Sequence, residues 1–176
     1  GLIKGVQYDS QHHAKNEDGQ KLIPDVVINL PEGKHIIVDS KVSLTAYHKY
    51  CSETEKDIAD GHLKDHLNAV RARVKELSDK NYYDLSGLNS LEYVLMFMPI
   101  EGAFSIASHE NHGLVESALK SNVIIVTPTT LLLALRTIEN IWRYEAQSQN
   151  AQLIATKAGQ LYDKFVGFVS DVENVG

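Results

Sequence analysis

A short β-hairpin with acidic residues at its open end constrains this chain more than any other feature. Residues 26–30 and 35–38 are β-branched runs of strand length, and Pro31-Glu32-Gly33 separates them. Pro31 suits the first position of a turn because its φ is fixed near the helical value. Gly33 can supply the positive φ that a three-residue loop closing in a bulge requires. The sequence therefore predicts two antiparallel strands joined by a tight turn.

The turn also sets the register of the hairpin. A three-residue loop pairs Leu30 with Lys34, and counting outward from that pair places Asp25 opposite Asp39. Directly opposed residues share one face of a sheet, with Cβ atoms about 4.5–5.5 Å apart. Lys41, two residues beyond Asp39, points to the same face. Slipping the register by one residue would move Asp25 to the other face.

Two carboxylates and a lysine at adjacent strand ends suggest metal-dependent phosphodiester cleavage. Asp25 and Asp39 could hold Mg²⁺, or Mn²⁺, with the backbone carbonyl of Ser40 as a third oxygen ligand. Such an ion lowers the pKa of a bound water and neutralises charge on the phosphate. Lys41 would position the water or stabilise the pentavalent phosphorus. On this hypothesis Asp39 and Lys41 are partly exposed, and their replacement leaves stability nearly unchanged. The structural alternative is that Asp25 caps a turn while Asp39 and Lys41 form a solvated ion pair.

Further residues are candidates for the same site. Gln11, near the end of a first predicted strand, could neighbour the hairpin, or it could be an ordinary strand-end amide. Glu101 follows a later strand and could be an extra acidic ligand, or it could cap the next backbone segment. His66, Arg71 and Arg73 lie on a predicted helix and could contact phosphates, although a solvated helix face explains them equally simply. We find no zinc-ligand pattern and no phosphate-binding glycine loop.

The order of predicted elements indicates an α/β fold. Strands are expected at residues 6–11, 26–30, 35–38, 91–98 and 123–126. Helices are expected at residues 44–57 and 63–77, separated by Asp60-Gly61, and near residues 110–120. Two more are expected from Pro128 to about residue 147, mostly buried, and from about residue 150 to 172. This pattern predicts a mixed β-sheet flanked by helices in a single domain spanning residues 1–176.

A series of motifs resembles one known family along nearly the whole chain. It includes Gly1-Leu2 with Tyr8 and Gln11, Pro24-Asp25-Val26-Val27, Val38-Asp39-Ser40-Lys41, residues 97–104 and 127–131, Trp142-Arg143, and residues 158–165. On these motifs the chain is similar to the RmuC family, often described as DNA recombination proteins. The resemblance implies a restriction-endonuclease-like core of the PD-(D/E)xK superfamily. It also implies a bacterial protein that acts on DNA and limits DNA rearrangement.

The resemblance also implies segments that would lie outside residues 1–176. Superfamily nucleases often place a further acidic ligand on a helix before the first strand, and that position would precede Gly1. RmuC-like proteins usually carry an N-terminal membrane anchor and a long coiled coil. We therefore expect a domain excised from a longer protein, itself cytoplasmic and without membrane contact, whose full-length form could be anchored at the inner membrane.

Composition limits the partners that this chain can bind. The net charge of −6 is unusual for a nucleic-acid protein, because phosphate binding normally needs a basic surface. The lone Cys51 excludes an internal disulfide and fits a reducing compartment. In the last predicted helix, apolar residues recur every three or four positions, which suggests self-association or a coiled-coil partner as well as cover for the core. The stripe consists of Ile154, Ala158, Leu161, Phe165, Phe168 and Val172.

These observations leave three functions open. The first is Mg²⁺-dependent hydrolysis of DNA, or DNA processing in recombination, by Asp25, Asp39 and Lys41. The second is a catalytically inert, DNA-associated scaffold that keeps the fold; the negative charge favours it. The third is hydrolysis of some other phosphodiester, which would require a small closed pocket instead of an open groove.

Overall fold

The computed structural model describes residues 2–10, 14–15, 21–80, 82 and 89–175, with backbone alone for 14–15, 21–22 and 168–175. The chain divides into two units, Gly1–Ile138 and Glu139–Gly176, and each is considered by itself. The first unit contains the β-sheet and its covering helices. A single domain over residues 1–176 stays a prediction.

Among the described residues, five strands form a mixed sheet in the order β1-β4-β5-β6-β7. Their bounds are Tyr8–Ser10, Val26–Asn29, Lys34–Asp39, Asn89–Phe97 and Val123–Val126. The pairs β1/β4 and β4/β5 are antiparallel, whereas β5/β6 and β6/β7 are parallel. Two short strands, β2 (Ala14–Lys15) and β3 (Lys21–Leu22), form a separate ladder. The expected α/β architecture with a mixed sheet is confirmed.

The hairpin between β4 and β5 has the predicted register. Val26 pairs with Val38, and the backbone N–H of Leu30 donates to the carbonyl of Lys34, so Asp25 and Asp39 follow as the next opposed pair. The turn Pro31–Gly33 is a short 3₁₀ segment, η1, in which Gly33 has the expected positive φ of 69°. Glu32 also has a positive φ, of 62°, which the sequence did not predict. The residues of the turn therefore fix the register of the hairpin, as the sequence predicted.

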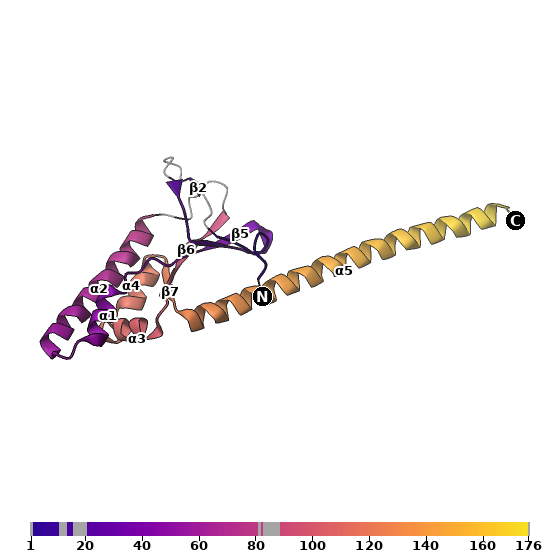
Figure 1. Cartoon of the computed structure of the whole chain (residues 1–176). Helices are drawn as coiled ribbons and strands as arrows, with labels where there is room; N and C mark the ends of the chain where they lie inside the picture. Colours follow the sequence, from indigo (N-terminus) through magenta and orange to yellow (C-terminus); the bar gives the residue numbers. More distant parts are fainter. Residues whose placement is uncertain (1, 11–13, 16–20, 81, 83–88, 176) are drawn as a thin grey trace. The chain divides into compact units, whose positions relative to one another are not determined.

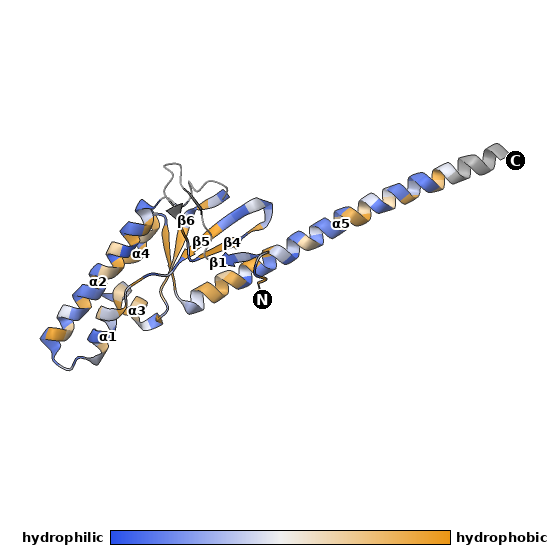
Figure 2. Ribbon diagram, turned by 45° about the horizontal axis from the view of Figure 1, so that its top comes forward, coloured by the Kyte–Doolittle hydropathy of each residue, from blue (hydrophilic) through white to orange (hydrophobic). Residues whose placement is uncertain are grey.

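Within the part of the chain that the structure describes, the helices α1 to α4 accompany the sheet and gather to one side of it in Figure 1. They are α1 (Thr45–Ser52), α2 (Lys56–Asp79), α3 (Glu101–Glu110) and α4 (Leu114–Lys120). The core lies between this helical layer and the sheet, where Ile37, Met96 and Val123 of the strands join Val70, Val74 and Leu77 of α2 in one buried cluster. Figure 2 shows the central strands as predominantly apolar. This face of the sheet is therefore covered by helices.

Two helix boundaries differ from the prediction. The break between α1 and α2 falls at residues 53–55, where the carboxylate of Glu53 accepts hydrogen bonds from the N–H groups of Thr54 and Glu55. Asp60 and Gly61 lie inside α2, where a Cβ on Gly61 would meet no other atom. The helix α3 was not predicted at all, and Glu101 opens it.

The helix α5 (Pro128–Val175) is continuous, where the sequence predicted two helices. It begins at Pro128, as expected, and Thr127 and Thr130 exchange hydrogen bonds at its start. No proline follows Pro128, and the side chain of Gln149 bonds Glu145 one turn earlier, so the helix continues through the expected break. The prediction that the first half of this helix is mostly buried was also wrong. Ile138 is buried, but other large apolar side chains are exposed: Leu132, Leu133, Ile141 and Tyr144.

Candidate functional site

The residues after β4 and β5 form one connected cluster at the open end of the hairpin. Oδ2 of Asp25 accepts hydrogen bonds from both the backbone N–H and the hydroxyl of Ser40, each at 2.9 Å. Oδ1 of the same carboxylate lies 4.0 Å from Nζ of Lys41, whose side chain is 68% exposed. Partial burial would raise the pKa of Asp25, but the two bonds from Ser40 and the charge of Lys41 outweigh it and lower that pKa. Asp25 is therefore an ionised carboxylate near the surface.

Asp39 has a different environment from Asp25. Only 1% of its surface is exposed, so the expectation that it is partly exposed was wrong. Its Oδ1 accepts from the guanidinium of Arg73 and, weakly at 3.4 Å, from the N–H of Lys41. Its Oδ2 accepts from the hydroxyl of Tyr82 at 2.9 Å. Burial, and then the nearby charge of Asp39, raise the pKa of Tyr82, which keeps that hydroxyl a donor.

A chain of ion pairs continues from Asp39 to the surface. Nη1 of Arg73 lies 2.5 Å from Glu76, and Glu76 also pairs with Lys80 at 2.9 Å. The hydrogen bonds from Arg73 and then from Lys80 lower the pKa of Glu76 to about 2. Arg73 is itself 6% exposed, so it links a buried carboxylate to a half-exposed one.

The burial of Asp39 follows from the side of the sheet on which it lies. Asp39 is two residues after Ile37, so both side chains point to the face that α2 covers. On α2, His66, Val70, Arg73 and Leu77 follow one another at spacings of four, three and four, which places them on one helical face. That spacing could have identified Arg73 as a buried partner from the sequence. Tyr82 follows a helix end, and no sequence signal marked it.

The cluster as arranged does not fit a divalent cation held by both aspartates. Both oxygens of Asp39 are engaged by Arg73 and Tyr82, and the Ser40 carbonyl accepts from the N–H of Val42 at 2.8 Å. The formal charges also cancel, because the carboxylates Asp25, Asp39 and Glu76 face the cations Lys41, Arg73 and Lys80. Among the described residues, no group of three or more His, Cys, Asp or Glu side chains could hold an ion. A hard cation needs unsatisfied oxygen ligands and net negative charge.

The other candidate residues are divided between the core and the surface. His66 is fully buried, and its Nε2 lies 3.0 Å from the carbonyl of Ala103, so a solvent-facing role is wrong for it and for the buried Arg73. Arg71 is exposed. Glu101 accepts from the N–H of Thr129 at 3.0 Å, which matches the capping alternative. Hydrogen bonds from the side chain and then the backbone of Thr129 lower the pKa of Glu101. Gln11 lies outside the described residues.

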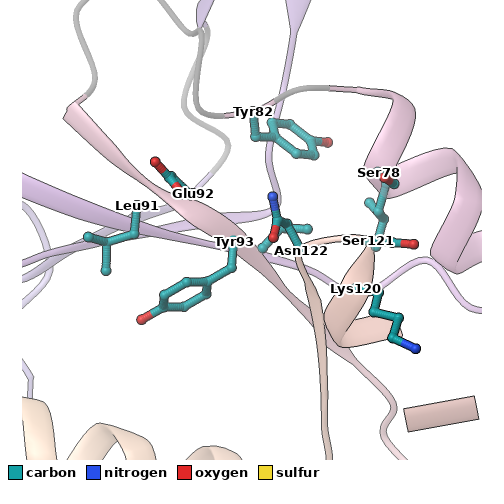
Figure 3. A pocket seen from close by; sticks show the side chains of 10 residues that line it. Ser78, Tyr82, Leu91, Glu92, Tyr93, Lys120, Ser121 and Asn122 are labelled. Carbon is teal, nitrogen blue, oxygen red and sulfur yellow. The ribbon is translucent and has the colours of Figure 1, made fainter. Parts of the chain in front are cut away.

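A hollow of about 170 Å³ lies beside Tyr82 rather than at Asp25. Figure 3 shows Tyr82 and Ser78 at one side of it, with Leu91, Glu92 and Tyr93 of β6 at another. Lys120, Ser121 and Asn122, which connect α4 to β7, complete the lining. Tyr82 therefore lines this hollow and also bonds the buried carboxylate of Asp39, whereas none of the predicted site residues that the structure describes lines it.

Comparison with known proteins assigns the family. The RmuC family model matches residues 1–176. The chain belongs to the RmuC family. It is 49% identical over its full length to the DNA recombination protein RmuC homolog of Pseudomonas aeruginosa and 47% identical to that of Vibrio cholerae. The DNA recombination protein RmuC of Escherichia coli is 43% identical over the same span. The predicted family is thereby confirmed.

The match covers only part of each relative. The chain spans 39%, 34% and 37% of the Pseudomonas, Vibrio and Escherichia proteins, respectively, so it corresponds to about a third of an RmuC protein. No solved structure matches the chain. Within the described residues, no helix combines the length and hydrophobicity needed to cross a membrane.

Proposed function

We propose that this chain is a DNA-processing domain in recombination and that it hydrolyses DNA phosphodiesters at the edge formed by Asp25, Ser40 and Lys41. One observation carries the proposal. The hairpin register brings an ionised carboxylate and an exposed ammonium together, with Asp25 Oδ1 and Lys41 Nζ 4.0 Å apart, next to Asp39. The names of the relatives, DNA recombination proteins, supply the substrate class.

Each residue of this edge has a distinct role in the proposal. The exposed Lys41 ammonium can contact a phosphate oxygen and stabilise charge that builds up in the transition state. Asp25 orients Lys41 and is itself held by the two hydrogen bonds from Ser40. The PD-(D/E)xK membership and the Mg²⁺ requirement belong to the proposal too. They require Asp39 to be free of Arg73, which the arrangement described above does not provide.

The inert, DNA-associated scaffold is the second candidate. Saturation of Asp39 by Arg73 and Tyr82 favours it, because a carboxylate with both oxygens engaged serves packing rather than chemistry. The net charge of −6 favours it as well, since it limits affinity for DNA. In this version Lys41 contacts a phosphate but no bond is cleaved.

Cleavage and binding assays distinguish the two candidates. Single- and double-stranded DNA is incubated with the full-length protein and Mg²⁺, Mn²⁺ or chelator, using wild type, Lys41→Ala and Lys34→Ala. Lys34 is the matched control, because it lies on the same hairpin but pairs with Glu32 at the turn. We expect cleavage that falls at least a hundredfold in Lys41→Ala and is unchanged in Lys34→Ala. An uncleaved substrate whose binding weakens only in Lys41→Ala would support the scaffold instead. Equal cleavage by both variants would contradict the role of Lys41.

A further inference from the structure

The guanidinium of Arg73 lies where a cation bound by Asp39 would be expected. It bonds Oδ1 of a carboxylate that is 1% exposed, while its other terminal nitrogen bonds Glu76. Arg73 is 6% exposed, so water does not screen this pair as it screens a surface ion pair. The attraction that would recruit a metal to Asp39 is thus already satisfied within the chain.

We propose that Arg73 is the resident cation of this cluster and that it excludes divalent metal from Asp39. The inference deepens the proposed function because it concerns the same residues, but it rests on the contacts of Asp39 and not on hydrolysis. Glu76 offers Arg73 a place to move. It is half exposed, already pairs with Arg73 and is held by Lys80, so Arg73 keeps a carboxylate partner when it leaves Asp39. A metal that reaches Asp39 must therefore displace Arg73 toward Glu76.

The charges around the site support this competition. With Arg73 in place, its charge and that of Lys41 oppose those of Asp25 and Asp39, so the pair of aspartates attracts little further positive charge. Without Arg73, the two aspartates exceed Lys41 by one negative charge, and Oδ1 of Asp39 keeps only the weak bond from the N–H of Lys41, so it can ligate a metal. The Tyr82 hydroxyl would still hold Oδ2 and so keep the carboxylate oriented.

Removal of the Arg73 charge is the direct test. Mn²⁺ binding is measured by calorimetry and by the electron paramagnetic resonance of free Mn²⁺, on wild type and on Arg73→Met, which keeps much of the apolar stem. We expect Arg73→Met to bind one Mn²⁺ at least tenfold more tightly than wild type. Addition of Asp39→Asn to Arg73→Met should remove that gain. Arg73→Lys, which restores a cation, and Glu76→Gln, which leaves Arg73 on Asp39, should both behave as wild type.

A second measurement covers the case in which Arg73→Met folds poorly. Mn²⁺ should then restore its circular dichroism and raise its melting temperature, and Asp39→Asn in the same background should abolish that rescue. Wild type and Asp39→Asn should bind Mn²⁺ equally. If wild type binds Mn²⁺ as tightly as Arg73→Met and loses it with Asp39→Asn, Arg73 does not exclude the metal and the inference is overturned. Failure of wild type to cleave DNA would reject the hydrolytic proposal and leave this inference standing.

Discussion

Replacement of Asp39 by alanine should strongly destabilise the domain. Replacement of a catalytic residue at the surface would instead change the free energy of unfolding little. The carboxylate is buried and holds both Arg73 and the Tyr82 hydroxyl. Breaking a buried ion pair from one side costs about 3–5 kcal/mol, and an orphaned buried hydroxyl costs about 1–3 kcal/mol. Glu76 still holds part of the Arg73 charge, so we take the lower end of the combined cost, about 4 kcal/mol. This is a large part of the stability of a typical domain, about 5–15 kcal/mol.

Thermal unfolding followed by circular dichroism measures this loss. For a chain of this size, about 2–4 °C is lost per kcal/mol, so the melting temperature should fall by roughly 10 °C. Asp25→Ala is the matched control, because it removes the opposed, partly exposed carboxylate and its two bonds from Ser40, at about 1–2 kcal/mol. The double variant Asp39→Ala/Arg73→Met should lose less stability than the two single variants lose together. The difference should be at least about 1 kcal/mol, as is typical of residues in contact. A fall for Asp39→Ala no larger than that for Asp25→Ala would refute the reasoning.

Two further predictions concern the ion-pair chain and α5. Arg73 and Lys80 lower the pKa of Glu76 from 4.5 to about 2, so this carboxylate stabilises the folded state above pH 4.5 and loses that effect as the pH falls toward 2. Urea unfolding should therefore show wild type more stable than Glu76→Gln by under about 1 kcal/mol at pH 7, with the difference vanishing by pH 2; a constant difference would contradict the assignment. Phe165 is exposed, and Figure 2 shows apolar residues recurring along α5, so we propose that this stripe binds a second copy. Light scattering should give a dimer for wild type and Gln160→Asp but a folded monomer for Phe165→Asp; a monomeric wild type would end the assembly idea. Phe168 and Val172, the last two stripe positions, lie where no side chains are described.

The sequence determined the features that depend on neighbouring residues. Pro31 and Gly33 specify the turn, and β-branched alternation specifies the strands, so the register that opposes Asp25 to Asp39 was predictable. Strand β7 and the start of α5 at Pro128 were predictable for the same reason, because each boundary is marked by local residue types. The continuity of α5 was not predictable. Residues 148–150 neither force a break nor exclude one, and only the structure shows that none occurs.

The tertiary structure decided what surrounds the candidate site. Asp39 and Arg73 are 34 residues apart, and Asp39 and Tyr82 are 43 apart, so no local rule pairs them. Their contact requires α2 to lie on the same face of the sheet as Asp39, and that choice of face depends on which helices cover the core. Turn chemistry acts over a few residues, whereas burial and charge pairing depend on the packing of distant segments. The sequence therefore predicted which residues stand side by side on the hairpin, and the fold decided that Asp25 and Lys41 reach the surface while Asp39 is buried beneath Arg73.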